Sequence, residues 1–150
     1  MTTLDYHIAF TVEKSASEVY RAICNVKEWW TKNILGNTET LNNEFTVHFG
    51  ETFVTFRVIE MIPYQKITWL VTDCYLHWLT DKSEWKNTQL EYEISETDEG
   101  TQMGMTHVGL EPGIECYENC KVGWDFYAGK SLYKLLNENK GQPDTGAGKR

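Results

Sequence analysis

The sequence lacks the features that would place it in a membrane or on nucleic acid. No stretch approaches the roughly eighteen consecutive apolar residues of a membrane-spanning helix, and residues 1–10 carry an acid and no basic region followed by an apolar run. The fourteen Lys and Arg residues are scattered and the formal net charge is −8, so no clustered positive charge is present to neutralise phosphates. We therefore expect a cytoplasmic protein that neither binds nucleic acid nor inserts into a membrane.

The sequence is also poor in cysteine and in catalytic motifs. A reducing cytosol would keep its few, irregularly spaced cysteines as buried thiols: Cys24, Cys74, Cys116 and Cys120. The last two are four residues apart on one helical face, where zinc binding with a histidine is the alternative, but no second pair of ligands follows. No nucleophile elbow, HExxH motif, phosphate loop or apolar carboxylate pair is found. We predict no metal, no cofactor and no dedicated catalytic residue.

Aromatic side chains are what the sequence has in excess. Six Trp, eight Tyr and six Phe make up 13% of the 150 residues, in a chain of the size of one domain with one core. This is more than the packing of one small core usually needs. We therefore expect some of these rings to line a cavity.

The pattern of apolar residues predicts several strands and one long helix. Apolar and polar residues alternate, with turns between them, over residues 5–13, 44–49, 52–62, 67–72, 90–95 and 103–107. After the first of these strands, Ser15 and Glu18 form a capping box that opens a short helix, and a second short turn follows. Residues 114–139 have the period of a long helix with one broad apolar stripe. Strands followed by a long helix indicate the α+β class.

Four segments resemble a known superfamily. They are FTVEKSASEVYRAICNVKEWW (10–30), the turn and strand at 63–69, DEGTQMGMTHVGL (98–110) and GWDFYAGKSLYKLLNENKGQP (123–143). Together they are similar to START-like (SRPBCC) proteins, in particular to the branch homologous to the activator of heat-shock protein 90 ATPase. The resemblance implies a helix-grip (Bet v 1-like) fold, a curved antiparallel sheet wrapped around a long C-terminal helix with an apolar cavity between them. We expect one such domain at residues 1–140 and a flexible tail at 141–150.

The resemblance and the aromatic excess together favour a non-enzymatic carrier or sensor. Its expected partner is a small hydrophobic molecule, such as a lipid or an aromatic or polyketide-like compound, held in the cavity. Two alternatives stay open: a cyclase or hydrolase that uses the same pocket, with proton transfer resting on His107, and an interaction module in contact with a chaperone. Because the resemblance begins within the first ten residues, we expect no additional N-terminal domain such as the chaperone activator has, and therefore no direct stimulation of a chaperone ATPase.

The candidate cavity residues lie on inferred inward faces of strands or on the apolar stripe of the last helix. The candidates are Trp69, Tyr92, Met103, Met105, His107, Trp124, Tyr127 and Ser131, with Trp78 in an apolar connection nearby. Ordinary core packing is the competing interpretation for each. For His107 the competing interpretation is a hydrogen bond inside the core, and for Ser131 it is a bond back to a carbonyl of its own helix.

Two further surface features are predicted. Residues 73–86 are strangely apolar for a connection, and Trp78 and Trp85 make this segment a candidate lid over the pocket mouth. A second apolar ridge lies opposite the helix stripe and predicts a partner surface, with a homodimer as the hypothesis; it consists of Val122, Phe126 and Tyr133. Arg57 competes with apolar neighbours for the inner face, so we place it outside.

Overall fold

The protein, seen here in a computed structural model, is described at residues 5–77, 79–111 and 114–143. In chain order the elements are β1 (Tyr6–Val12), α1 (Ala16–Cys24), α2 (Val26–Trp29), β2 (Ile34–Gly36), β3 (Glu44–Phe49), β4 (Thr52–Ile62), β5 (Lys66–Tyr75), β6 (Gln89–Thr97), β7 (Gly100–Val108), α3 (Tyr117–Phe126), the π-helical turn η1 (Tyr127–Ser131) and α4 (Leu132–Glu138).

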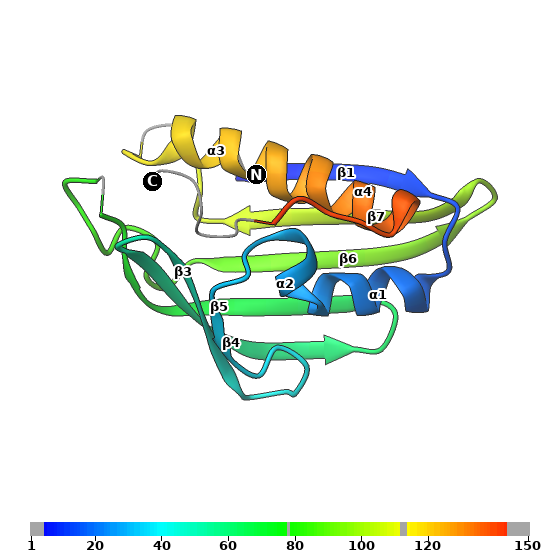
Figure 1. The fold of residues 1–150 in the computed structure, drawn as a ribbon, viewed down its shortest axis with the longest axis horizontal. Coiled ribbons are helices and arrows are strands. Elements are labelled where there is room, and N and C mark those ends of the chain that lie inside the picture. The colour runs from blue at the N-terminus through cyan, green and yellow to red at the C-terminus, as the bar shows by residue number, and fades with distance from the viewer. Residues whose placement is uncertain (1–4, 78, 112–113, 144–150) are drawn as a thin grey trace.

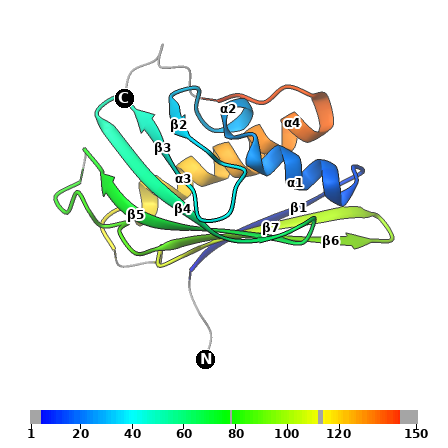
Figure 2. The same cartoon turned by 90° about the horizontal axis from the view of Figure 1, so that it is seen from below.

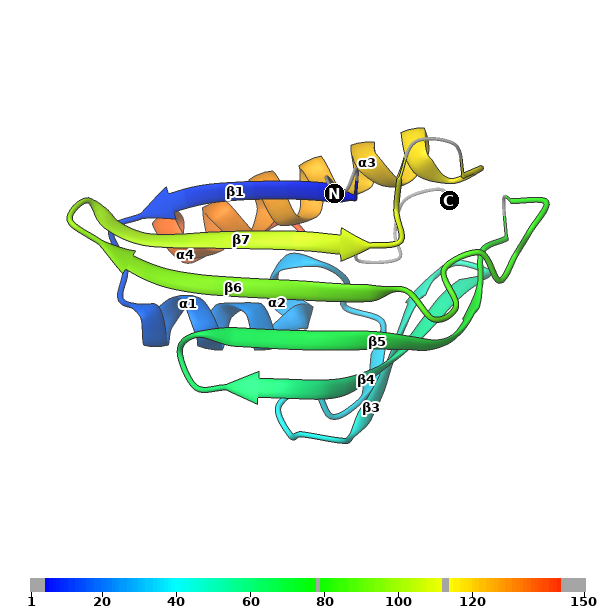
Figure 3. The same ribbon diagram turned by 180° about the vertical axis from the view of Figure 1, so that it is seen from behind.

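The strands form one antiparallel sheet of seven strands in the order β1-β7-β6-β5-β4-β3-β2. Strands β2 to β7 follow one another as a meander, whereas β1 pairs with the last strand, so that Tyr6 lies opposite His107. All the described helices lie on one face of the sheet (Figures 1 and 3). The β3–β4 end curls up toward the helices (Figure 2). The α+β helix-grip fold predicted from the sequence is thus confirmed.

Local sequence signals explain where the helices begin and bend. The capping box is present: Ser15 Oγ accepts from the Glu18 amide, and the Glu18 carboxylate accepts from the Ser15 amide. The C-terminal helix changes to π-helical hydrogen bonding at η1 before it continues as α4. Inside this turn, Gly129 lies against β1, since an added Cβ would stand 2.6 Å from Ile8 Cδ1. A residue without a side chain therefore lets the helix approach the sheet closely.

The centre of the concave face is filled by side chains. Trp29 at the end of α2 is fully buried, and its ring meets the ring of Tyr92 edge-on with centroids 6.4 Å apart. Its indole N–H donates to the Ile23 carbonyl at 3.2 Å. Trp29 thus fills the space beside Tyr92 in the middle of the sheet, and an apolar cavity lies toward one end of the sheet.

Two predicted surface features, Arg57 and the second apolar ridge of the last helix, are visible in the structure. Arg57 lies outside, where its guanidinium pairs with Glu44 across β3 and β4 at 3.4 Å. The second apolar ridge of the last helix is exposed, with exposed fractions of 67% at Val122, 37% at Phe126 and 42% at Tyr133. The outward position of Arg57 and the exposure of the ridge are thus as predicted, and the use of the ridge as a partner surface stays a prediction. Among the described residues, no helix is long and apolar enough to span a bilayer.

Two features differ from the sequence pattern or extend it. The three-residue edge strand β2 was not predicted, because a strand this short carries no alternation to read. At the other end of the chain, Gly141 is buried and the Gln142 amide donates to Ser131 Oγ at 2.6 Å. The first residues of the predicted tail are therefore packed against the domain.

Candidate functional site

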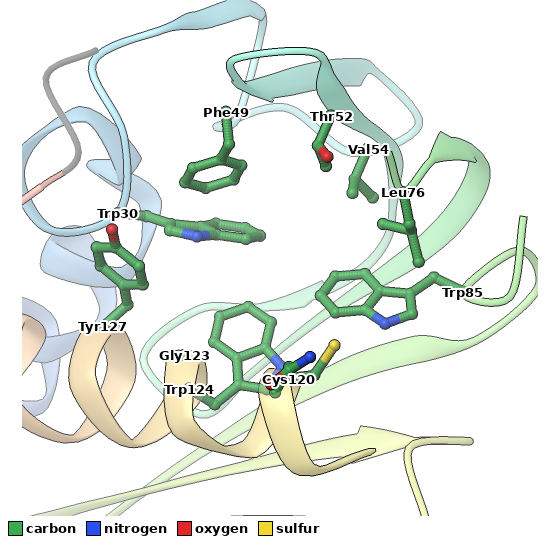
Figure 4. A pocket seen from close by; sticks show the side chains of 11 residues that line it. Trp30, Phe49, Thr52, Val54, Leu76, Trp85, Cys120, Gly123, Trp124 and Tyr127 are labelled. Carbon is green, nitrogen blue, oxygen red and sulfur yellow. The ribbon is translucent and has the colours of Figure 1, made fainter. Parts of the chain in front are cut away.

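A cavity of about 170 Å³ lies at the end of the sheet where the helix α3, the β3–β4 hairpin and the connection after β5 meet. Figure 4 shows the side chains that surround it. Its lining consists of Trp30, Phe49, Thr52, Val54, Leu76, Trp85, Asn119, Cys120, Gly123, Trp124 and Tyr127. The surface that faces the cavity is almost entirely apolar, and the exposed Asn119 marks the place where the cavity reaches the outside.

Aromatic rings from four different segments form most of the wall. The ring of Trp124 on α3 lies 4.8 Å from that of Trp30, which follows α2, and 6.0 Å from the nearly parallel ring of Trp85. Phe49 at the end of β3 lies 5.7 Å from Trp30 and 6.2 Å from Tyr127. Because these rings hold one another in place, the wall is preformed.

The connection at residues 76–88, here called the lid segment, closes one side of the cavity with Leu76 and Trp85. Two carboxylates connect it to the start of α3. One belongs to the lid segment and accepts from amides before α3, and the other precedes α3 and accepts from amides of the lid segment. Glu84 accepts from the backbone amides of Glu115 and Cys116, each at 2.8 Å. Glu115 accepts in return from the amides of Thr80 at 2.8 Å and Asp81 at 3.2 Å. The predicted lid thus carries part of the cavity wall through Trp85, whereas Trp78 lies outside the described residues.

The negative charge of Glu115 contributes to this connection between the lid segment and α3. The amide donors of Thr80 and Asp81 hold the pKa of its carboxyl below the usual value, because they stabilise the ionised form. Lys82 adds to the order of the segment, since its ammonium donates to the carbonyls of His77 and Leu79 at 2.8 and 2.7 Å. Side-chain charges therefore satisfy much of the backbone of a connection that has no regular secondary structure.

His107 lies behind the wall and connects its two parallel indoles. The Trp124 indole N–H donates to His107 Nδ1 at 3.1 Å, and His107 Nε2 lies 2.9 Å from Thr88 Oγ1. The Thr88 hydroxyl donates its proton to the Trp85 carbonyl at 2.6 Å, so Nε2 of His107 must be the donor to Thr88. Both ring nitrogens are used within the protein, and His107 is absent from the cavity lining.

The burial of His107 keeps it uncharged. Burial lowers its pKa to about 3, and the nearby charge of Asp5 offsets only part of this effect. A neutral ring with one N–H and one lone pair is the form that this network requires. The arrangement matches the interpretation of His107 as a hydrogen-bonded core residue that positions Trp124.

The other sequence-predicted residues fall into two groups. Trp124 and Tyr127 line the cavity. Four more are fully buried on the concave face and do not line it: Trp69, Tyr92, Met103 and Met105. Trp29 fills the space against Tyr92, so the inward face of a strand does not by itself distinguish core from cavity. The role of these four residues as ligand contacts stays a prediction.

Ser131 does not bond back to a carbonyl of its own helix, as its competing interpretation predicted, and its role as a ligand contact stays a prediction. Its hydroxyl donates to the Trp29 carbonyl at 2.7 Å, on α2 rather than on its own helix, and accepts from the Gln142 amide. Since Ser131 sits at the end of the π-helical turn, it ties three distant parts of the chain together. It does not line the cavity.

Two of the cysteines differ from the expectation that all four are thiols. The structure pairs Cys116 with Cys120 as a disulfide, with Cα atoms 5.6 Å apart. One helical turn brings the two Cα atoms into the range that a disulfide spans, which the expectation of a reducing compartment does not take into account. Cys24 and Cys74 are free and buried, and burial raises the pKa of the Cys24 thiol to about 12. No group of three or more metal-binding side chains occurs among the residues that the structure describes.

Most residues that line the cavity were not among the ligand contacts predicted from the sequence. Trp30 and Trp85 were visible as exceptional aromatic residues near turns and connections, which was the available signal. Phe49 and Val54 belong to predicted strands, but nothing in their alternation says which end of the sheet stays open. Gly123 carried no signal, because an absent side chain becomes part of a cavity only through its surroundings.

Known proteins resemble this chain in sequence pattern and in fold. The family model described as activator of Hsp90 ATPase homolog 1-like protein matches residues 13–137. No curated protein matches the chain.

Solved structures share the fold at low sequence identity. The structure of the Aha1 dimer from Colwellia psychrerythraea is 19% identical, with a TM-score of 0.76 over 93% of this chain and 100% of that one. Protein MLL2253 from Mesorhizobium loti is 16% identical, with a TM-score of 0.72 over 90% and 98%. DynU16, a protein of the dynemicin biosynthetic locus, is 17% identical, with a TM-score of 0.70 over 93% of this chain and 49% of that one.

With a family model that covers most of the domain and a sheet and helix arranged as in these structures, the chain belongs to the activator of Hsp90 ATPase homolog 1-like family, within the START-like superfamily.

Proposed function

We propose that the protein binds a small apolar molecule in the cavity between α3, the β3–β4 hairpin and the lid segment, and acts as a carrier or sensor. The observation that carries this proposal is the aromatic-walled cavity of about 170 Å³ that reaches the surface at Asn119. Apolar surface that stays uncovered in a folded protein is unfavourable, so a lining of this kind favours an apolar occupant.

The position of His107 favours binding over catalysis. The cyclase or hydrolase alternative assigned proton transfer to this residue, but its lone pair accepts from Trp124 and its N–H serves Thr88. A general base must reach the proton that it removes. Behind the wall and with a pKa lowered to about 3, His107 is a positioning residue for Trp124.

Filling the cavity tests the proposal. Gly123 lines the cavity, and a Cβ added there would meet no heavy atom within 4 Å. We expect Gly123→Leu to fold normally, because leucine is a better helix former than glycine by nearly 1 kcal/mol, and to lose the binding of a small apolar probe such as naphthalene. Calorimetric titration of naphthalene into wild type and variant measures the loss.

Gly123→Ala serves as the matched control. It brings the same gain in helix propensity, which should raise the free energy of unfolding by about 0.5–1 kcal/mol, but fills little of the cavity. Binding that is retained in Gly123→Ala and lost in Gly123→Leu supports the proposal. Equal naphthalene affinity in wild type and Gly123→Leu would place the probe elsewhere and contradict it.

A second proposal concerns assembly. We propose that the exposed ridge of Val122, Phe126 and Tyr133 pairs with the same ridge of a second copy, since contiguous exposed apolar side chains favour association. The similar structure from Colwellia psychrerythraea is described as a dimer. Sedimentation at micromolar concentration should show a dimer that Val122→Lys converts to monomer. A monomer in the wild type contradicts pairing and leaves a chaperone contact as the use of this surface.

A further inference from the structure

We propose that the occupant of the cavity is a compact planar aromatic molecule of one or two rings whose inserted part carries no polar atom, with any polar substituent left at the mouth beside Asn119. This inference rests on the proposed binding function and names the class of ligand. It follows from the size of the cavity, the aromatic rings of its walls and the almost entirely apolar surface that they present.

The size of the cavity selects compact molecules. An apolar cavity of roughly 150 Å³ accommodates a molecule such as benzene, whereas drug-sized ligands occupy about 300–1,000 Å³. At about 170 Å³ the cavity belongs to the first class. The tail of a long-chain lipid or the four rings of a sterol exceed it, because Trp29 and its neighbours fill the rest of the concave face.

The walls select flat molecules. Trp30, Phe49, Trp85 and Trp124 surround the cavity as rings from separate segments (Figure 4). Aromatic faces and edges pack best against other rings, in stacked or edge-on arrangements. The rings are also braced from behind, because Thr88 and His107 connect the Trp85 backbone to the Trp124 indole. The cavity therefore keeps its shape when it is empty.

Very few polar atoms of the wall face the cavity, whose surface is almost entirely apolar. The indole N–H of Trp124 is used by His107, and the Thr52 hydroxyl accepts from the amide of His77 at 3.1 Å. The indole nitrogen of Trp85 has no partner but is covered by protein atoms, so it presents no surface to the cavity. A polar atom carried into the cavity would lose its hydrogen bonds to water and meet a surface that is almost entirely apolar. Asn119, which is exposed, is the polar side chain at the mouth.

Isosteric probes test the inference. Naphthalene and quinoline have the same shape, but quinoline carries one ring nitrogen that accepts hydrogen bonds in water. We expect naphthalene to bind the wild type about ten-fold more tightly than quinoline, because the wall offers almost no polar surface to replace those hydrogen bonds. Dodecanoate, as a lipid probe, should fail to displace naphthalene. The affinities are measured by calorimetric titration and competition.

A pair of matched variants sharpens the test. Val54→Thr places a hydroxyl of similar size in the wall and should bring the naphthalene preference down several-fold, because quinoline gains a donor. Val58→Thr makes the same change on the same strand, but away from the cavity, and should leave the preference unchanged. If Val54→Thr fails to fold, the wild-type ratio and the dodecanoate competition still decide.

The outcomes separate the two proposals. If neither ring compound binds the wild type, the binding function itself fails. If both bind with equal affinity, a donor such as the Trp30 indole N–H reaches the ligand; the function stands and the inference about the polar-free site is overturned. Displacement of naphthalene by dodecanoate overturns the inference about size.

Discussion

Replacing His107 with leucine is expected to lower the free energy of unfolding by roughly 2–4 kcal/mol, although the two side chains are similar in size. The change removes the acceptor of the buried Trp124 N–H and the donor to Thr88. A buried donor without a partner costs about 1–3 kcal/mol, and the loss of the second hydrogen bond adds to this. Chemical denaturation of both proteins, with comparison of their midpoints and slopes, measures the difference.

Two further variants distinguish the hydrogen-bond network from packing. His107→Gln keeps an acceptor for Trp124 and a donor for Thr88 within one amide group, so it should be less harmful than leucine. Trp124→Phe removes the orphaned donor, so its combination with His107→Leu should cost less than the sum of the single changes. Additive effects, or a loss below about 0.5 kcal/mol for His107→Leu, would show that the network contributes little.

The stability of the protein is expected to fall by about 2 kcal/mol between pH 7 and pH 5, and His107 is the cause. Burial lowers its pKa to about 3 in the folded protein, whereas the ordinary value is 6.5. Below pH 6.5, His107 therefore binds a proton in the unfolded chain that it does not bind in the folded protein. The contribution is present above this pH and declines by up to about 1.4 kcal/mol per unit as the pH falls toward 3.

The pH window separates His107 from the carboxylates. The donors around Glu18 and Glu115 lower their pKa values, so their contributions are lost only as the pH falls below about 4.5. Denaturation curves at pH 7, 6 and 5 should therefore converge in His107→Gln and diverge in the wild type. A wild type that is equally stable at pH 7 and pH 5 would mean that His107 is accessible to water in the folded protein.

Much of the sheet could be predicted because its signals are local. Alternation identified six of the strands to within a few residues, and the pair Ser15 and Glu18 located the start of α1. The last helix was recognised from its apolar stripe, but its π-helical turn was not. That turn depends on how Gly129 meets Ile8 across the domain, which no local pattern records.

The site was harder to predict because a cavity is a property of packing. The inward faces of the strands were identified correctly, yet Tyr92 and Met105 are buried in the core while Phe49 and Val54 border open volume. The difference lies in Trp29, whose ring fills the middle of the concave face from a helix only four residues long. Hydrophobic periodicity tells which side chains point inward and not whether another side chain meets them there.

The lid segment shows what composition can add. Its unusual apolar content marked residues 73–86 as more than a connection, and Trp85 indeed forms part of the cavity wall. The backbone hydrogen bonds that Glu84 and Glu115 each accept from the other's segment could not be foreseen, since the two residues are 31 positions apart in the sequence and meet only in the fold. Charged residues are common in connections, so the sequence alone does not reveal which backbone groups they bind in the fold.

The most direct measurement of ligand binding is a map of nuclear Overhauser contacts between bound naphthalene and the protein. Binding in the cavity predicts contacts from the naphthalene protons to the rings of Trp30, Phe49 and Trp124. Contacts confined to the exposed ridge of Val122, Phe126 and Tyr133, or none at saturating probe, would contradict it.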